Sequence, residues 1–125
     1  MQYLSVAAGA MLGANLRFVL ATWATDQWGP DFPYGTFLIN VTGAFVIGVF
    51  LAIVTTRVAV DPLWRLFFAT GFLGGYTTFS SYAWEALTLA EDGAWLRAGA
   101  YVIGSNAVGL FGVWLGASLT RVLPF

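Results

Sequence analysis

The sequence contains no cysteine and no histidine, and each absence excludes a class of chemistry. Without cysteine the chain can form neither a disulfide nor a thiol nucleophile. Without histidine it has no imidazole base, and the usual side-chain ligands of transition metals are missing. Because no nucleophile–base pair stands out among the other residues, the sequence does not predict an enzyme.

Charge is also scarce, since only 9% of the residues are charged and the formal net charge is -1. The basic residues are all arginine, and the five of them are scattered: Arg17, Arg57, Arg65, Arg97 and Arg121. Nucleic-acid surfaces need clustered positive charge, so no nucleic-acid partner is expected.

Apolar residues are abundant instead, at 59% of the chain with a mean hydropathy of +0.79. A soluble domain carries about 25% charged residues, so this chain cannot cover a surface that faces water. The apolar run from Tyr3 to about Trp23 is too long for a signal peptide and has no cationic start, which favours a first span. We therefore expect one multi-pass transmembrane domain over residues 1–125, surrounded by the lipid bilayer.

Four apolar segments approach the roughly 20 residues that cross a bilayer as a helix. They cover about 3–23, 34–54, 62–90 and 95–120. The segments between them are rich in Asp, Gly and Pro, which are typical of loops. The predicted fold is an all-α membrane protein with four transmembrane helices.

The third segment is too long for one upright helix, because its roughly 28 residues would extend about 42 Å against a hydrocarbon core of about 30 Å. Its centre, from Gly71 to Tyr82, reads GFLGGYTTFSSY. Glycine, threonine and serine are weak helix formers, so this composition predicts a break in the third helix near the midplane.

Four spans place both termini on one side, together with Arg57, Arg65 and Arg121, while Arg97 lies on the other side. This small excess leaves insertion in both orientations open.

Glycine pairs at four-residue spacing, such as Gly112 and Gly116, let helices approach closely and favour packing within one chain. Four such helices can hardly enclose a route for a solute, so we expect function to require a second copy.

Polar residues within the spans are the candidate functional groups. In the second span Thr36, Asn40 and Gly43 share one helical face, and Asn40 is either an interhelical hydrogen-bonding group or a donor beside a polar route. In the fourth span Tyr101 and Ser105 lie one turn apart and could donate to an anion or serve helix contacts. Asn106 points about 100° away from Ser105, which predicts that those two serve different features.

Arg17 is the only cation deep in a span and Glu85 is the only acid. Charges at this depth are costly and are usually paired or functional, although Arg17 could also extend toward the interface.

Phe79 and Tyr82 lie three residues apart on one face. The edges of such rings are electropositive and could receive a small anion, but packing is their commoner role.

A break in the third helix would free backbone carbonyl groups, which are tolerated at depth only inside protein or beside water. Carbonyl groups of this kind can coordinate a hard cation such as sodium.

GFLGGYTTFSSY, followed by Trp84 and Glu85, resembles the signature of the Fluc (CrcB) family of small bacterial fluoride channels. The resemblance extends to residues 13–18 (GANLRF) in the first span, to residues 35–45 (GTFLINVTGAF) in the second, and to the length and the four spans. The family usually has phenylalanine where Tyr82 stands, and some relatives have serine at the position of Gly109.

The resemblance implies an antiparallel, dual-topology dimer in the bacterial inner membrane, with two fluoride pores along the interface. It implies a structural, non-transported sodium ion held by the carbonyl groups of Gly74 and Thr77. The resemblance places Asn40, Phe79 and Tyr82 along the pores and Tyr101 and Ser105 on a polar track beside them. We also expect Thr78, Ser81 and Arg17 in the ion pathway. The partner subunit is either an identical copy or a sibling chain.

The expected function is therefore passive export of cytoplasmic fluoride, which reduces fluoride toxicity. A small four-helix proton-coupled drug exporter is one alternative, but it needs a membrane-embedded carboxylate, generally in the first span, where this chain has Arg17. A non-transporting membrane assembly subunit is the other alternative, and it leaves the Asn40 face and the broken third span unexplained.

Overall fold

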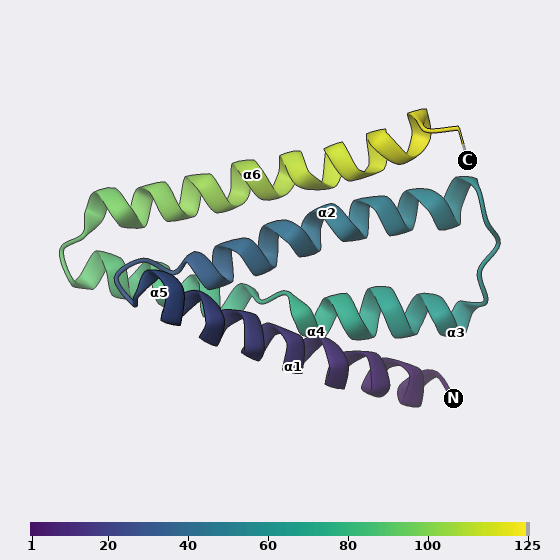
Figure 1. Ribbon diagram of the computed structural model, residues 1–125, viewed down its shortest axis with the longest axis horizontal. Helices are drawn as coiled ribbons and strands as arrows, with labels where there is room; N and C mark the ends of the chain where they lie inside the picture. Colours follow the sequence, from purple (N-terminus) through teal and green to yellow (C-terminus); the bar gives the residue numbers. More distant parts are fainter. Residues whose placement is uncertain (125) are drawn as a thin grey trace.

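The computed structural model describes residues 1–124, which form helices and short connections without any strand (Figure 1). The elements are α1 (Gln2–Trp28), α2 (Tyr34–Thr56), α3 (Pro62–Arg65), the π-helical segment η1 (Leu66–Leu73), α4 (Gly74–Tyr76), α5 (Phe79–Glu91) and α6 (Trp95–Val122). The prediction of an all-α chain is confirmed for this described part.

Three helices within residues 1–124, namely α1, α2 and α6, are long and apolar enough to cross a membrane. They coincide with the first, second and fourth predicted spans and exceed most of them by a few residues. The third predicted span is divided between the α3–η1–α4 segment and α5. That this divided segment also crosses the membrane stays a prediction.

The long helices run alternately in opposite directions, and both termini lie at the same end of the molecule (Figure 1). The connection between α1 and α2 and the turn between α5 and α6 lie at the other end. Arg57, which follows α2, donates hydrogen bonds to the carbonyl groups of Arg121 and Leu123 at 3.0 and 3.2 Å. The guanidinium group therefore caps the end of α6, where the helix dipole favours a positive charge.

Glycine allows the closest helix contacts. A Cβ atom added at Gly9 or Gly13 of α1 would collide with the backbone at Phe67 or Phe72. A Cβ atom at Gly116 of α6 would collide with the Phe45 carbonyl of α2. Packing of glycine pairs within the chain is therefore confirmed, as a helix can approach a neighbouring backbone this closely only without a side chain.

The break in the third segment is shorter than predicted. Helical geometry continues through Gly71 to Tyr76, and the chain is extended only at Thr77 (φ -81°, ψ 156°) and Thr78 (φ -148°, ψ 120°). The glycines before the break serve packing, since a Cβ atom at Gly75 would lie 2.7 Å from the Ala10 carbonyl oxygen of α1. Composition alone does not separate a glycine that breaks a helix from one that packs it.

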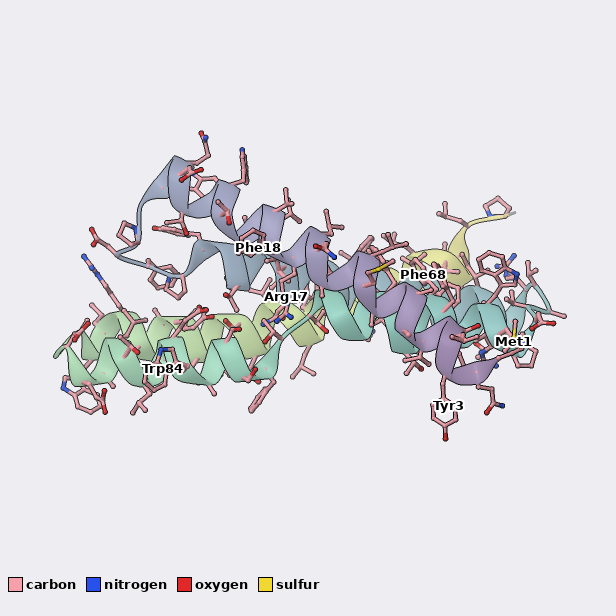
Figure 2. The ribbon with its side chains drawn as sticks, turned by 90° about the horizontal axis from the view of Figure 1, so that it is seen from below. Met1, Tyr3, Arg17, Phe18, Phe68 and Trp84 are labelled. Carbon is pink, nitrogen blue, oxygen red and sulfur yellow. The ribbon has the colours of Figure 1, made fainter. Side chains whose placement is uncertain are left out.

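Little of the chain is buried, and the outer surface is apolar. Side chains project outward along the whole length of the molecule (Figure 2), and Tyr3, Phe18 and Trp84 are 90%, 72% and 67% exposed. Two small clusters of buried side chains form the interior: Ile39, Leu73 and Tyr76 between α2 and η1–α4, and Leu89, Ala98 and Tyr101 between α5 and α6. A surface of this kind is stable against lipid or a protein partner, not against water.

Candidate functional site

The break at Thr77–Thr78 is held in place by Asn40 of α2. The Asn40 amide group donates to the Thr78 carbonyl at 2.9 Å and accepts from the Thr78 N–H at 2.8 Å. Gly43, one turn further along α2, lies against the Thr77 side chain, and a Cβ atom there would collide with it. Asn40 thus satisfies both polar groups of one extended residue, which would be costly to leave unpaired inside a membrane.

The same arrangement redirects backbone N–H groups on both sides of the break away from their usual helical acceptors. In an uninterrupted helix the Thr78 N–H would donate to the Gly74 carbonyl, but here it donates to Asn40. The Ser81 N–H would likewise reach the Thr77 carbonyl, but it donates to Thr78 Oγ1 at 3.2 Å, as in a helix N-cap. Gly74 and Thr77 are thus two of the carbonyl groups that lose their usual helical donors at the break.

An open groove of about 440 Å³ lies beside the break, between α2, η1–α4, α5 and α6. It is lined by seven of the predicted site residues: Asn40, Gly74, Thr77, Thr78, Phe79, Tyr82 and Ser105. The second Nδ2 hydrogen of Asn40 is not needed for the bond to Thr78, so this residue can hold the break and still offer a donor. Both alternatives considered for Asn40 are compatible with its position.

Two aromatic rings at the start of α5 form one wall of the groove. The Phe79 and Tyr82 ring centroids lie 5.4 Å apart at an interplanar angle of 51°. Tyr101 packs behind Tyr82, with ring centroids 5.3 Å apart. Phe79 is 77% exposed within the single chain, so this wall is open on its outer side.

The α6 side of the groove carries Ser105 and Asn106. Ser105 Oγ is buried and, among residues 1–124, has no hydrogen-bond partner. Asn106 Nδ2 donates to the Tyr82 hydroxyl oxygen at 2.9 Å. The prediction that Ser105 and Asn106 serve different features is wrong, because a groove this wide takes side chains separated by about 100° on one helix.

Tyr101 does not line the groove. Its side chain is only 1% exposed, and its hydroxyl donates to Glu85 Oε2 at 2.9 Å. Thr36 donates to the other oxygen of the same carboxylate at 2.7 Å. Thr36 and Tyr101 thus hold Glu85 between α2, α5 and α6, and this three-residue group was not predicted. The only sequence signal for it was that Glu85 is the only acidic residue deep within a predicted span.

Two other predicted pathway residues also lie outside the groove lining. Ser81 contacts Thr78, whose hydroxyl donates to Ser81 Oγ at 3.1 Å, so Ser81 belongs to the start of α5. Arg17 is half-buried on α1, roughly midway between the ends of the molecule (Figure 2). Within residues 1–124 no cluster of three Asp or Glu side chains could hold a metal ion.

Residues 4–117 match the model of the family described as "CrcB-like protein, Camphor Resistance (CrcB)". A protein of Roseiflexus sp. (strain RS-1), named fluoride-specific ion channel FluC, is 49% identical over 99% of this chain and 100% of its own length. Proteins of the same name from Acidobacterium capsulatum and Chloroflexus aurantiacus are 46% and 43% identical, over 93% and 94% of both chains. The chain belongs to the CrcB-like family.

Proposed function

We propose that this protein is a fluoride-specific ion channel that lets fluoride leave the cytoplasm passively across the inner membrane. The observation that carries the proposal is the groove beside the broken helix, where Asn40, Phe79, Tyr82 and Ser105 converge in an otherwise apolar chain. The names of the relatives support the same function. These relatives are named as channels, and neither drug export nor an assembly role has comparable support.

The chemistry of the groove suits a small, strongly hydrated anion. Such an ion enters a membrane protein only where donors replace its water, and the groove offers amide, hydroxyl and ring-edge groups. Hydrogen fluoride crosses membranes as a neutral acid and dissociates in a less acidic cytoplasm, which traps fluoride inside. A passive pore is sufficient to release the trapped anion down its electrochemical gradient.

The functional unit in this proposal is an antiparallel dimer with four membrane crossings in each subunit. The amide and hydroxyl groups that line the groove are poorly suited to face lipid, because hydrocarbon offers them no hydrogen-bonding partner. A second copy, inserted in the opposite orientation, would cover the groove and turn it into a pore. The partner is an identical copy or a sibling chain of the same fold.

A structural sodium ion fits at the break. The carbonyl groups of Gly74 and Thr77 are left without their helical donors, since the N–H groups of Thr78 and Ser81 bond elsewhere. Neutral carbonyl oxygens are suitable ligands for a hard monovalent cation, and two antiparallel copies would supply two sets of them. The ion would join the two breaks and stay in place while fluoride passes.

Fluoride efflux from liposomes tests the channel function. Purified full-length protein is reconstituted into vesicles loaded with fluoride, and release is followed with a fluoride-selective electrode after the membrane potential is clamped. Rapid fluoride release with chloride retained is the expected result. No release from this protein, while an established fluoride channel releases fluoride under the same conditions, would overturn the proposal.

Exchange of the cation tests the sodium site separately. We expect the dimer to dissociate or unfold at lower temperature when sodium is replaced by a large organic cation such as N-methylglucamine. Restoring sodium should restore stability with a saturable dependence on its concentration, as expected for a ligand that binds only the folded state. Equal stability in both salts would argue against a sodium ion at the break.

A further inference from the structure

The Tyr82 hydroxyl group lies in the groove and is held by Asn106, a residue to which no role has yet been given. The Tyr82 ring is fixed between Phe79 and Tyr101, with centroid distances of 5.4 and 5.3 Å. The hydroxyl oxygen accepts a hydrogen bond of 2.9 Å from Asn106 Nδ2. Ring and hydroxyl are thus both held at the groove wall.

The orientation of the Asn106 amide is set by its own helix. Asn106 Nδ2 also donates to the Val102 carbonyl at 2.8 Å. A flipped amide would place its oxygen against that carbonyl, and two acceptors repel each other. The two Nδ2 hydrogens are therefore directed at the Val102 carbonyl and at the Tyr82 hydroxyl, and Nδ2 cannot accept a hydrogen bond from that hydroxyl.

The consequence concerns the hydroxyl hydrogen of Tyr82. A phenol hydrogen prefers the plane of its ring and has two such positions. The donor from Asn106 lies against the oxygen on one side, so the hydrogen takes the other side. The neighbouring Tyr101 hydroxyl is already committed as a donor to Glu85 Oε2.

We propose that Asn106 is a positioning residue that turns the Tyr82 hydroxyl hydrogen into the groove, where it donates to the passing anion. This inference rests on the proposed function and extends it by a specific donor. The groove then offers a hydroxyl hydrogen bond in addition to ring edges. Asn106 acts only through Tyr82, because both of its amide hydrogens are committed.

A double-mutant cycle tests this inference. Tyr82→Phe removes the hydroxyl, Asn106→Leu removes the amide at similar size, and the double variant removes both. Efflux is measured over a range of fluoride concentrations in liposomes. We expect each single variant to raise the half-saturating fluoride concentration about three- to tenfold, since hydrogen bonds to charged groups are strong but this groove is open to water. The double variant should match the larger single effect.

Thr88→Val is the matched control, because the Thr88 hydroxyl bonds only within α5, to the Trp84 carbonyl. It should leave the half-saturating concentration unchanged, and the dimer fraction of all variants should equal that of the parent. The inference would be overturned if the double variant raised the half-saturating fluoride concentration by the product of the two single factors. It would also be overturned if Tyr82→Phe left that concentration unchanged. In both cases the channel function would stand. A parent protein that releases no fluoride would overturn the channel function and this inference with it.

Discussion

At the scale of single residues, Phe79 is the more exposed of the two aromatic rings that form one wall of the groove. Its ring is 77% exposed and contacts Tyr82 through a tilted pair, so it contributes little to the interior of its own chain. An aromatic ring offers an electropositive edge to an anion, and an aliphatic side chain of similar size does not.

Phe79→Ile should therefore lower fluoride efflux at least about tenfold, which corresponds to about 1.4 kcal/mol on the barrier. The dimer fraction and the unfolding temperature should stay close to those of the parent. Phe111→Ile is the matched control, because Phe111 is 55% exposed on α6 but does not line the groove. Normal efflux through a correctly assembled Phe79→Ile dimer would remove this ring from the pathway.

Asn40 combines a structural and a functional role, and the two can be separated by measurement. Asn40→Leu removes the partners of both the Thr78 N–H and the Thr78 carbonyl. Because each of the two unsatisfied buried groups costs about 1–3 kcal/mol, the free energy of unfolding should fall by about 2–6 kcal/mol. Loss of efflux should accompany this loss of stability.

Thr55→Val controls for the removal of a polar group from α2, since the Thr55 hydroxyl bonds only to carbonyl groups of its own helix. Its stability, measured by denaturant titration in detergent, should change by less than about 1 kcal/mol. If Asn40→Leu were as stable as this control, Asn40 would not hold the break.

At the scale of elements, the contact between α1 and the η1–α4 segment positions the first half of the broken helix. Gly13→Ala adds a Cβ atom that would collide with the Phe72 carbonyl, and a backbone cannot move away as a side chain can. We expect a loss of about 1–3 kcal/mol in unfolding free energy. In contrast, Gly99 of α6 has open space around it, and Gly99→Ala should be neutral or slightly stabilising because alanine favours the helix.

These two variants are compared by the same denaturant titration and by their dimer fractions. A larger loss of stability in Gly99→Ala than in Gly13→Ala would show that the close contact of α1 does not limit stability. The comparison uses one chemical change at two positions, so differences arise from the surroundings of the added methyl group.

The sequence predicted the existence of the broken element better than its position. The run GFLGGYTTFSSY correctly indicated an interruption, because seven of its twelve residues are glycine, threonine or serine, which are weak helix formers. It could not separate Gly71 and Gly75, which pack against α1, from Thr77 and Thr78, where the chain is extended. That distinction depends on two distant partners, the backbone of α1 and the Asn40 side chain.

The candidate site, like the broken helix, was predicted in part from the sequence. Residues close to the break in sequence, such as Phe79 and Tyr82, do line the groove, and their part in conduction stays a prediction. Tyr101 was expected beside them from its helical spacing with Ser105. Its hydroxyl instead turns to Glu85, since a carboxylate at this depth attracts the nearest donors, and spacing along one helix says nothing of such a partner on another.

At the scale of the whole molecule, the distribution of charge bears on orientation in the membrane. Arg57 and Arg121 lie at the end that carries both termini, where Arg57 bonds the end of α6. Part of this positive charge is thus committed to capping a helix. Because the excess of arginine at this end is small, we expect only a small free-energy difference between the two orientations in the membrane.

Accessibility of single cysteines tests the orientation, and the cysteine-free sequence makes each label unique. Val58→Cys places a thiol at the end with the termini, where Val58 is 53% exposed, and Asp92→Cys places one in the exposed turn at the other end. If two copies insert antiparallel, a membrane-impermeant thiol reagent should label about half of each variant in intact cells, because the two orientations are nearly equal in energy. Full labelling of one variant and none of the other would show a fixed orientation. The groove would then need a partner other than an inverted copy of this chain.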